Sequence, residues 1–317
     1  MTRRCCGGAL SVAALLLLPV EGQAQGDGPR VQTPAPAGIN VVSLTFHGLS
    51  SNFNFAQSIL IEDADISSDV WALSYKRFFS LGGRLAELWV TGIWGSVSGS
   101  GTVGSDPPPI LPFPPGTELD IPTISGLADP YVALRVGLSG APALGLQEFL
   151  STPQSFQLYA LLGANVPLGE YSSSKPLNLG TNRWAFRLGL PMVLPFASPE
   201  SRTSLEVVPS LYLYTDNDDP FRAGLREQDP LFVVESHLTR NLTDRLWAGL
   251  DLRYQTGGAT TTDGVSDDNR IASVGGGATV GFEVAPFFQV FGGYGGIFAE
   301  TDGSEGQMWR FRGILLF

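Results

Sequence analysis

Charged side chains of both signs occur at alternate positions inside otherwise apolar segments, and they are the residues whose placement most suggests chemistry. In 182–195, for example, Arg183 and Arg187 alternate with Trp184 and Phe186. Opposite charges on one face of several strands can pair across a wet interior and stabilise it, which we favour, or form a polar constriction that selects small solutes. The residues predicted to line this lumen are Lys76, Glu87, Asp129, Arg135, Arg183, Arg187, Glu206, Glu235, His237, Asp251, Arg253, Arg310 and Arg312.

An enzyme or a metal centre is not indicated by the remaining residues. The only histidines, His47 and His237, lie on distant segments, and no Gly-x-Ser-x-Gly motif provides a nucleophile for a serine hydrolase. A zinc site would need several His, Cys or carboxylate ligands at workable spacing, and the chain offers no such group. We therefore predict no catalytic residue, no metal site and no cofactor.

One acidic run resembles the start of a calcium-binding loop. It spans 216–219, but Pro220 replaces a ligand and Phe221 stands where the turn glycine should be. We interpret the run as solvated acids of an outer loop. Loose binding of divalent cations near lipopolysaccharide is the alternative.

The elements that must position the charged residues are β-strands. From Trp309 to Phe317 every second residue is apolar or glycine, while Arg310 and Arg312 lie on the opposite face. Period-two alternation is typical of a strand whose two faces meet different surroundings, here lipid and a wet lumen. About twelve such segments follow one another along the chain from Ile39 onward. Their predicted ranges are 39–49, 66–79, 84–98, 127–139, 154–167, 182–195, 203–214, 229–241, 245–256, 269–284, 287–298 and 307–317.

Composition supports strands that cross a membrane. Hydrophobic residues make up 43% of the chain and charged residues only 15%, against roughly 25% charged residues in an ordinary soluble domain. After the first twenty residues no apolar run is long enough for a membrane-spanning helix, so strands must do any spanning. We predict an all-β fold, a single antiparallel transmembrane β-barrel of the outer-membrane type over residues 39–317.

Residues 1–24 have the features of a secretory signal peptide. Arg3 and Arg4 precede an apolar stretch, and the small residues Gly22 and Ala24 favour cleavage after Ala24. Both cysteines of the chain lie in this segment, so the mature protein would contain no thiol. Removing Arg3, Arg4 and Glu21 from 19 basic and 30 acidic residues leaves 17 and 29, a net charge of −12. This sign argues against nucleic-acid binding, and the leader predicts export to the Gram-negative cell outer membrane.

The connections between segments alternate between short and long, as expected for periplasmic turns and outer loops. Residues 25–38 show no periodicity and are expected to be a disordered, flexible periplasmic lead-in. The stretch 141–153 is long for a periplasmic turn, and a short amphipathic helix and a plain turn are equally compatible with it. Loop 99–126 is rich in proline and apolar; its Ile110, Leu111 and Phe113 could form a lid over the mouth or belong to a mobile loop.

Several motifs resemble one known family. They are 126–130 (GLADP), 140–144 (GAPAL), 165–171 (NVPLGEY), 178–186 (NLGTNRWAF), 227–230 (EQDP), 237–242 (HLTRNL) and 257–264 (GGATTTDG). As a set they resemble the outer-membrane proteins grouped under the meta-pathway of phenol degradation. The resemblance implies a transporter-like barrel with uptake of aromatic or other hydrophobic compounds, and it carries no catalytic residue. The terminal Phe317 is similar to the signal that the barrel assembly machinery reads.

Two functions follow as alternatives. The barrel mediates passive passage of small solutes, aromatic or hydrophobic compounds among them, or it has a closed lumen with a structural or binding role and no conduction. The expected partners are outer-membrane lipid and lipopolysaccharide, the assembly machinery through the C-terminal strand, and a small solute.

Overall fold

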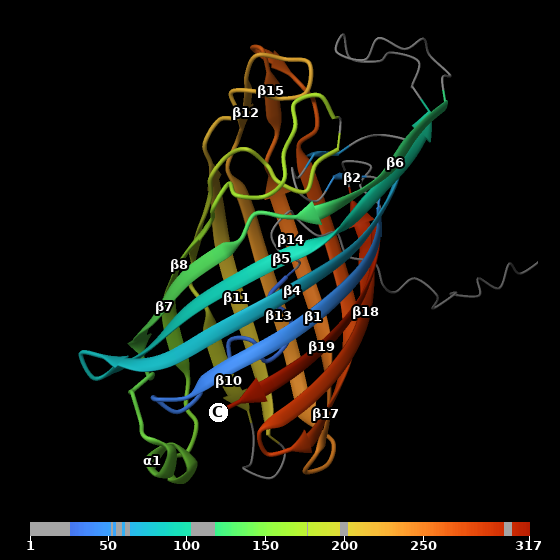
Figure 1. Cartoon of the computed structure of the whole chain (residues 1–317). Helices are drawn as coiled ribbons and strands as arrows, with labels where there is room; N and C mark the ends of the chain where they lie inside the picture. Colours follow the sequence, from blue (N-terminus) through green and yellow to red (C-terminus); the bar gives the residue numbers. More distant parts are fainter. Residues whose placement is uncertain are drawn as a thin grey trace, which may run out of the picture.

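The computed structural model describes residues 26–51, 53–54, 59–60, 64–102, 118–175, 177–196, 202–300 and 306–317. The signal segment 1–24 and the lid candidates Ile110, Leu111 and Phe113 lie outside these residues and remain predictions. Almost all described residues belong to an antiparallel β-barrel (Figure 1). No helix in the described part of the chain has both the length and the apolar character needed to cross a membrane.

The wall of the barrel is one closed sheet of 14 strands. Because β6 and β7 pair with successive parts of β5, and β9 and β10 with successive parts of β11, the wall is 12 strands around, which confirms the predicted number. The strands are β1 (Asn40–Ser51), β4 (Ala64–Leu81), β5 (Arg84–Thr102), β6 (Glu118–Leu127), β7 (Tyr131–Ser139), β8 (Gln157–Asn165), β9 (Ala185–Gly189), β10 (Met192–Phe196), β11 (Thr203–Tyr214), β13 (Leu231–Asn241), β14 (Leu246–Gly257), β17 (Ile271–Ala285), β18 (Phe288–Glu300) and β19 (Gly306–Leu316).

Closure joins the first wall strand to the last. β1 pairs with β19 along its whole length, from Val41 opposite Leu316 to Ser51 opposite Gly306. The Phe317 amide donates to the Asn40 carbonyl at 2.9 Å, and the Asn40 amide donates to the Phe317 carbonyl at 2.7 Å. Every wall strand therefore has two neighbours, and the sheet has no unpaired edge along this seam.

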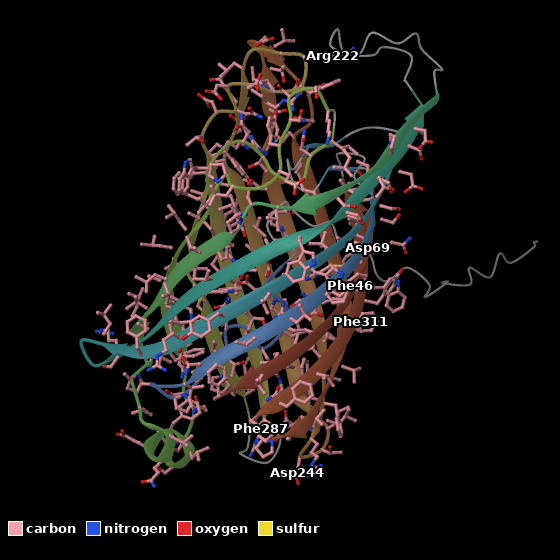
Figure 2. All side chains as sticks on the ribbon, in the orientation of Figure 1. Phe46, Asp69, Arg222, Asp244, Phe287 and Phe311 are labelled. Atoms are coloured by element: carbon pink, nitrogen blue, oxygen red, sulfur yellow. The ribbon has the colours of Figure 1, made fainter. Side chains whose placement is uncertain are left out.

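The two faces of the wall differ as the alternation predicts. Trp184, Phe186 and Leu188 are exposed on the outside, whereas Arg183 and Arg187 are buried inside. Figure 2 shows Phe46 and Phe311, which are register partners, projecting from the wall, with Arg222 and Asp244 at opposite ends of the barrel. An apolar outer band with charged residues at its ends suits a lipid environment.

Two predicted elements differ from the structure. Loop 99–126 is partly strand, because β5 continues to Thr102 and pairs with β6 as far as Glu118. Serine and glycine dominate this part of β5, so the hydrophobic alternation that marks a strand is weak there. The predicted strand 182–195 is divided between β9 and β10 at Pro191, which has no amide hydrogen to donate to the sheet.

The two ends of the barrel are unlike each other. The end that carries Phe317 has tight turns and the helix α1 (Leu146–Ser151), which confirms a helix within 141–153 (Figure 1). The opposite end carries the short strands β12 (Arg226–Gln228), β15 (Thr260–Thr262) and β16 (Val265–Ser266), which form a small sheet between predicted loops. Strands β2 (Phe53–Asn54) and β3 (Ile59–Leu60) also pair with each other.

The prediction of a disordered lead-in at residues 25–38 is wrong for its described part, 26–38. Asp27, Val31 and Gln32 of this segment are buried, and their hydrogen-bond partners are inward-facing residues of the wall. We call residues 26–38 the lumen segment. The sequence lacks periodicity here because the partners that order the segment lie on many different strands instead of on a neighbouring element.

We predict that position 281 must be glycine because the Trp247 ring packs directly against it. A Cβ atom at Gly281 would lie 2.1 Å from the indole ring. Gly281→Ala should therefore destabilise the barrel by about 1–3 kcal/mol, the usual cost of overpacking, measured by denaturant unfolding in detergent. Gly92→Ala, in another wall strand with no atom near the added methyl group, is the matched control. Equal unfolding midpoints for the two variants would contradict the prediction.

Candidate functional site in the barrel lumen

The structure places the predicted lumen-lining residues on the inner face of the barrel. All of them are buried except Arg312, which is partly buried. Two of them are not on strands: Asp129 lies in the connection between β6 and β7, and Arg183 lies in the loop before β9, where it donates to the Gln228 side chain. The wall and the lumen segment bring most of the others together into three groups of charges. Outside these groups, Glu206 contacts the lumen segment and Arg312 donates to the Thr45 hydroxyl at 2.7 Å.

The first group is centred on Glu87. Its carboxylate lies 2.8 Å from the Lys76 ammonium and 2.5 Å from the Arg135 guanidinium. The Lys76 ammonium also lies 3.9 Å from the ring centre of Trp89, and the Arg135 guanidinium lies 4.3 Å from that of Tyr159. Two cations thus share one carboxylate, and aromatic faces provide further electrostatic stabilisation.

The second group joins the lumen segment to β9. Both oxygens of the Asp27 carboxylate accept hydrogen bonds from the Arg187 guanidinium, at 2.8 and 3.0 Å. The third donor of the guanidinium, Nε, bonds to the Ser210 hydroxyl at 3.0 Å. Asp27 also accepts a hydrogen bond from the Gln32 side chain at 2.6 Å.

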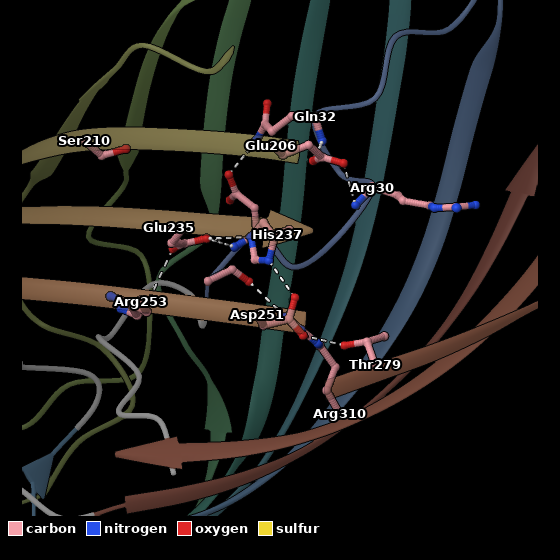
Figure 3. Close-up of polar contacts among 12 residues, drawn as sticks. Arg30, Gln32, Glu206, Ser210, Glu235, His237, Asp251, Arg253, Thr279 and Arg310 are labelled. Atoms are coloured by element: carbon pink, nitrogen blue, oxygen red, sulfur yellow. Dashed lines mark hydrogen bonds and ion pairs between the residues drawn. The ribbon is translucent and has the colours of Figure 1, made fainter. Parts of the chain in front are cut away.

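The third group surrounds His237 on β13 (Figure 3). Its Nδ1 lies 2.7 Å from Asp251, and its Nε2 lies 3.6 Å from Glu235. Arg253 contacts Glu235 at 3.3 Å, and Arg310 approaches Asp251 to 3.9 Å. Because each ring nitrogen of His237 faces a carboxylate, the arrangement suits the protonated form of this side chain. Neither nitrogen is then open to act as a general base.

The wall charges also bind the backbone of the lumen segment. The amides of Arg30 and Gln32 donate to Glu206 at 2.8 and 3.0 Å (Figure 3). In the opposite sense, Arg135 donates to the Gln32 carbonyl at 2.6 Å and Lys76 to the Val31 carbonyl at 3.2 Å. Ionic side chains here satisfy backbone groups that a strand or helix would otherwise pair.

Close approach of the segment to the wall depends on glycine. Gly28 has φ +81°, and a Cβ atom there would lie 2.5 Å from the Arg310 guanidinium. Beyond it, the Arg30 side chain reaches Asn241 at 2.5 Å and lies 4.3 Å from the ring centre of Trp247. The segment is therefore held along its length by polar contacts.

Loop 166–184 is fixed by Asp129. Its carboxylate accepts hydrogen bonds from the Gly169 amide at 2.8 Å and from the Thr181 amide and hydroxyl at 2.9 and 2.6 Å. Leu177 and Leu179 of this loop pack against Ile66 and Val97. Asp129 therefore holds this loop in place, whereas the sequence predicted it among the charges that line the lumen.

Sequence reasoning missed the residues of the lumen segment, of which Asp27, Arg30 and Gln32 make the most contacts. No periodicity or motif marks them. Only the glycines on either side of Asp27 hint at close packing. Across the described residues no cluster of three His, Cys, Asp or Glu side chains could hold a metal ion.

Comparisons with known proteins agree with this architecture. A family model described as "Putative MetA-pathway of phenol degradation" matches residues 52–312, and the chain therefore belongs to this family. An outer membrane channel from Pseudomonas putida F1 is similar in structure, with a TM-score of 0.72 and 20% identity over 92% of this chain and 99% of that one. At this identity the likeness shows the fold alone.

More distant structures include KdgM porin, with a TM-score of 0.43 and 7% identity over 86% of this chain and 98% of that one. The transport unit of the autotransporter AIDA-I from Escherichia coli has a TM-score of 0.44 and 10% identity, over 87% of this chain and 89% of that one. A search of curated proteins found no match to this sequence. The fold and family are those of an outer-membrane barrel, which supports a location in the outer membrane.

Replacement of the shared carboxylate should weaken the barrel. Glu87→Gln would leave Lys76 and Arg135 buried together without their anion, and breaking a buried ion pair typically costs about 3–5 kcal/mol. We expect a lower midpoint of denaturant unfolding in detergent. Glu227→Gln changes an exposed residue of β12 and is the control, with an effect of about 0.5 kcal/mol or less. Similar midpoints for the two variants would contradict this account.

Proposed function

We propose that this barrel mediates passive passage of small solutes across the outer membrane, aromatic or hydrophobic compounds among them, and that the lumen segment is a movable constriction. The family and the fold support a channel. The proposal is not enzymatic: of the two buried histidines, His237 is held between carboxylates and His47 lies against Met308. One observation about the lumen segment carries the proposal.

The lumen segment is held mainly by polar contacts. Its buried apolar side chains among the described residues are those of Pro29, Val31 and Pro36. A hydrogen bond to a charged group typically contributes about 1.5–3 kcal/mol net, because water replaces part of the interaction when the bond breaks. An apolar plug would instead have to expose its surface to water in order to move. Polar contacts therefore favour a segment that can exchange with solvent.

The connection to the wall also permits movement. Gly38 has φ +99° and no atom within 4 Å of a Cβ built on it. Three prolines, Pro29, Pro34 and Pro36, lack the amide hydrogen that a central strand requires, so the segment is prevented from joining the sheet. The amide and carbonyl of Gly38 are bonded to Phe78 and Arg77 of the wall. The segment can therefore leave the lumen by rotation just before Gly38, which breaks the bond from the Ala37 amide to the Leu144 carbonyl while β1 stays paired on both sides.

The closed barrel remains the second candidate function. This function is favoured because the lumen segment occupies the lumen. There it contacts Lys76 and Arg135, which pair with Glu87, and also Glu206. In that case the segment would be a permanent part of the structure, and the barrel would bind or anchor without conducting.

Two partners follow from the position of the wall. We infer that outer-membrane lipid and lipopolysaccharide contact the exposed apolar band. The assembly machinery would recognise the C-terminal strand, where the Phe317 side chain is 61% exposed while its backbone closes the barrel. The predicted cleavage after Ala24 would leave the lumen segment close to the mature N-terminus.

Deletion of residues 26–36 should distinguish the two candidates. We expect the variant to show discrete openings in planar bilayers with a conductance several times that of the intact protein, because the deletion removes the atoms that occupy the lumen. Liposome flux of benzyl alcohol should rise in parallel. Heat-modifiable migration in gels checks that the variant still forms the barrel. If neither protein conducts or passes the solute, the closed barrel is the correct function.

A further inference from the structure

We propose that Arg187 is a carboxylate-binding site of the lumen, that Asp27 occupies it in place of a solute, and that a small aromatic carboxylate opens the barrel by displacing Asp27. The opening step rests on the proposed function, whereas the binding site does not.

The guanidinium of Arg187 is arranged to bind one planar carboxylate. Nη1 and Nη2 bond to the two oxygens of Asp27 at 2.8 and 3.0 Å, which is the bidentate geometry that arginine forms with carboxylates. The bond from Nε to Ser210 fixes the orientation of the guanidinium plane. The Arg187 side chain is 4% exposed, so the site is already desolvated.

Arg187 depends on the lumen segment for its anion. Lys76 and Arg135 share Glu87, a residue of the wall, and Arg253 contacts Glu235, also of the wall. The register partners of Arg187 are Gly163 and Tyr212, neither of which is acidic. Within the described residues its ion pair is with Asp27 alone. Departure of the segment would leave this buried cation without its ion-pair partner, with only the more remote Glu235, already shared by Arg253 and His237, as a wall anion. This loss is costly and creates a demand for another carboxylate.

The surroundings of the site favour an aromatic ligand. The Arg187 guanidinium lies 5.6 Å from the ring centre of Tyr212. On the other side, the Tyr131 hydroxyl occupies the space over Gly163, where a Cβ atom would lie only 2.2 Å away. Both tyrosines are buried. Once the lumen segment has left, a carboxylate attached to a flat ring would contact these tyrosine rings in offset or edge-to-face geometry.

Displacement of Asp27 would loosen the segment beyond the site itself. The Asp27 carboxylate also accepts a hydrogen bond from the Gln32 side chain, and the backbone amide of Asp27 donates to Glu235 at 2.8 Å. Because a solute carboxylate and Asp27 cannot occupy the guanidinium together, the solute binds only the state in which Asp27 has left. Such a ligand shifts the population towards the released segment, and its apparent affinity falls with the fraction of protein in that state.

Direct binding of benzoate to the purified full chain in detergent tests the site. Asp27→Asn removes the internal competitor's charge and should tighten benzoate binding by about tenfold or more, the scale of a lost charge-assisted pair of hydrogen bonds. Adding Arg187→Gln should abolish that gain. Adding Arg240→Gln instead is the matched control and should preserve it, because it removes the same charge from an exposed residue of β13. Benzyl alcohol and benzylammonium should not compete with benzoate.

Two results would overturn the site: Asp27→Asn binding benzoate no more tightly than the unaltered protein, or benzoate binding that survives Arg187→Gln. If Arg187→Gln prevents folding, as judged by heat-modifiable migration, Ser210→Ala replaces it, because loss of the Nε anchor should weaken benzoate binding without removing a charge. Unchanged affinity in Ser210→Ala would equally count against the fixed guanidinium.

Planar bilayers test the opening step separately. Benzoate should raise the open probability of the unaltered protein, and benzyl alcohol at the same concentration should not. If benzoate binds as expected but no variant conducts, the proposed channel fails while the carboxylate site stands. If the protein conducts and benzoate neither binds at Arg187 nor changes the openings, the site fails while the channel stands.

Discussion

Backbone pairing around a closed ring is the constraint on which the rest of this structure depends. A strand in hydrocarbon has no water to satisfy its amides and carbonyls, so each wall strand must have two neighbours. Pairing of β1 with β19, extended by the mutual bonds of Asn40 and Phe317, meets this requirement. Once the ring is closed, alternation sends every second side chain outwards to lipid and the rest into the lumen.

The inward set then has to be satisfied inside a narrow space. Cations and carboxylates of neighbouring strands meet through the register, as with Glu87 opposite Arg135 and His237 opposite Asp251. The wall does not complete every pairing by itself. Arg187 and Glu206 find their partners on the lumen segment, which supplies the Asp27 carboxylate and backbone amides. The same contacts that order the segment therefore make it sensitive to anything that competes for them.

Much of the architecture could be predicted because it depends on local pattern. The strands, the closing seam and the inward direction of residues such as Arg187 follow from a period of two, which each segment carries in its own residues. The hydrophobic alternation that marks a strand is weak where serine and glycine stand at positions that large apolar side chains occupy elsewhere. The continuation of β5 and the strand β6 were therefore expected to be loop. The break at Pro191 was also missed, because the alternation runs through it unchanged.

The sequence by itself determined an outer-membrane barrel of twelve strands and which side chains face its lumen, since alternation and hydrophobicity are properties of neighbouring residues. Only the tertiary structure decided how those lumen charges are used. Residues 26–38 carry no pattern, and their order comes from contacts with strands far away in the chain, such as Asp27 with Arg187. A long-range contact of this kind depends on where several strands meet in space, and no local period records it.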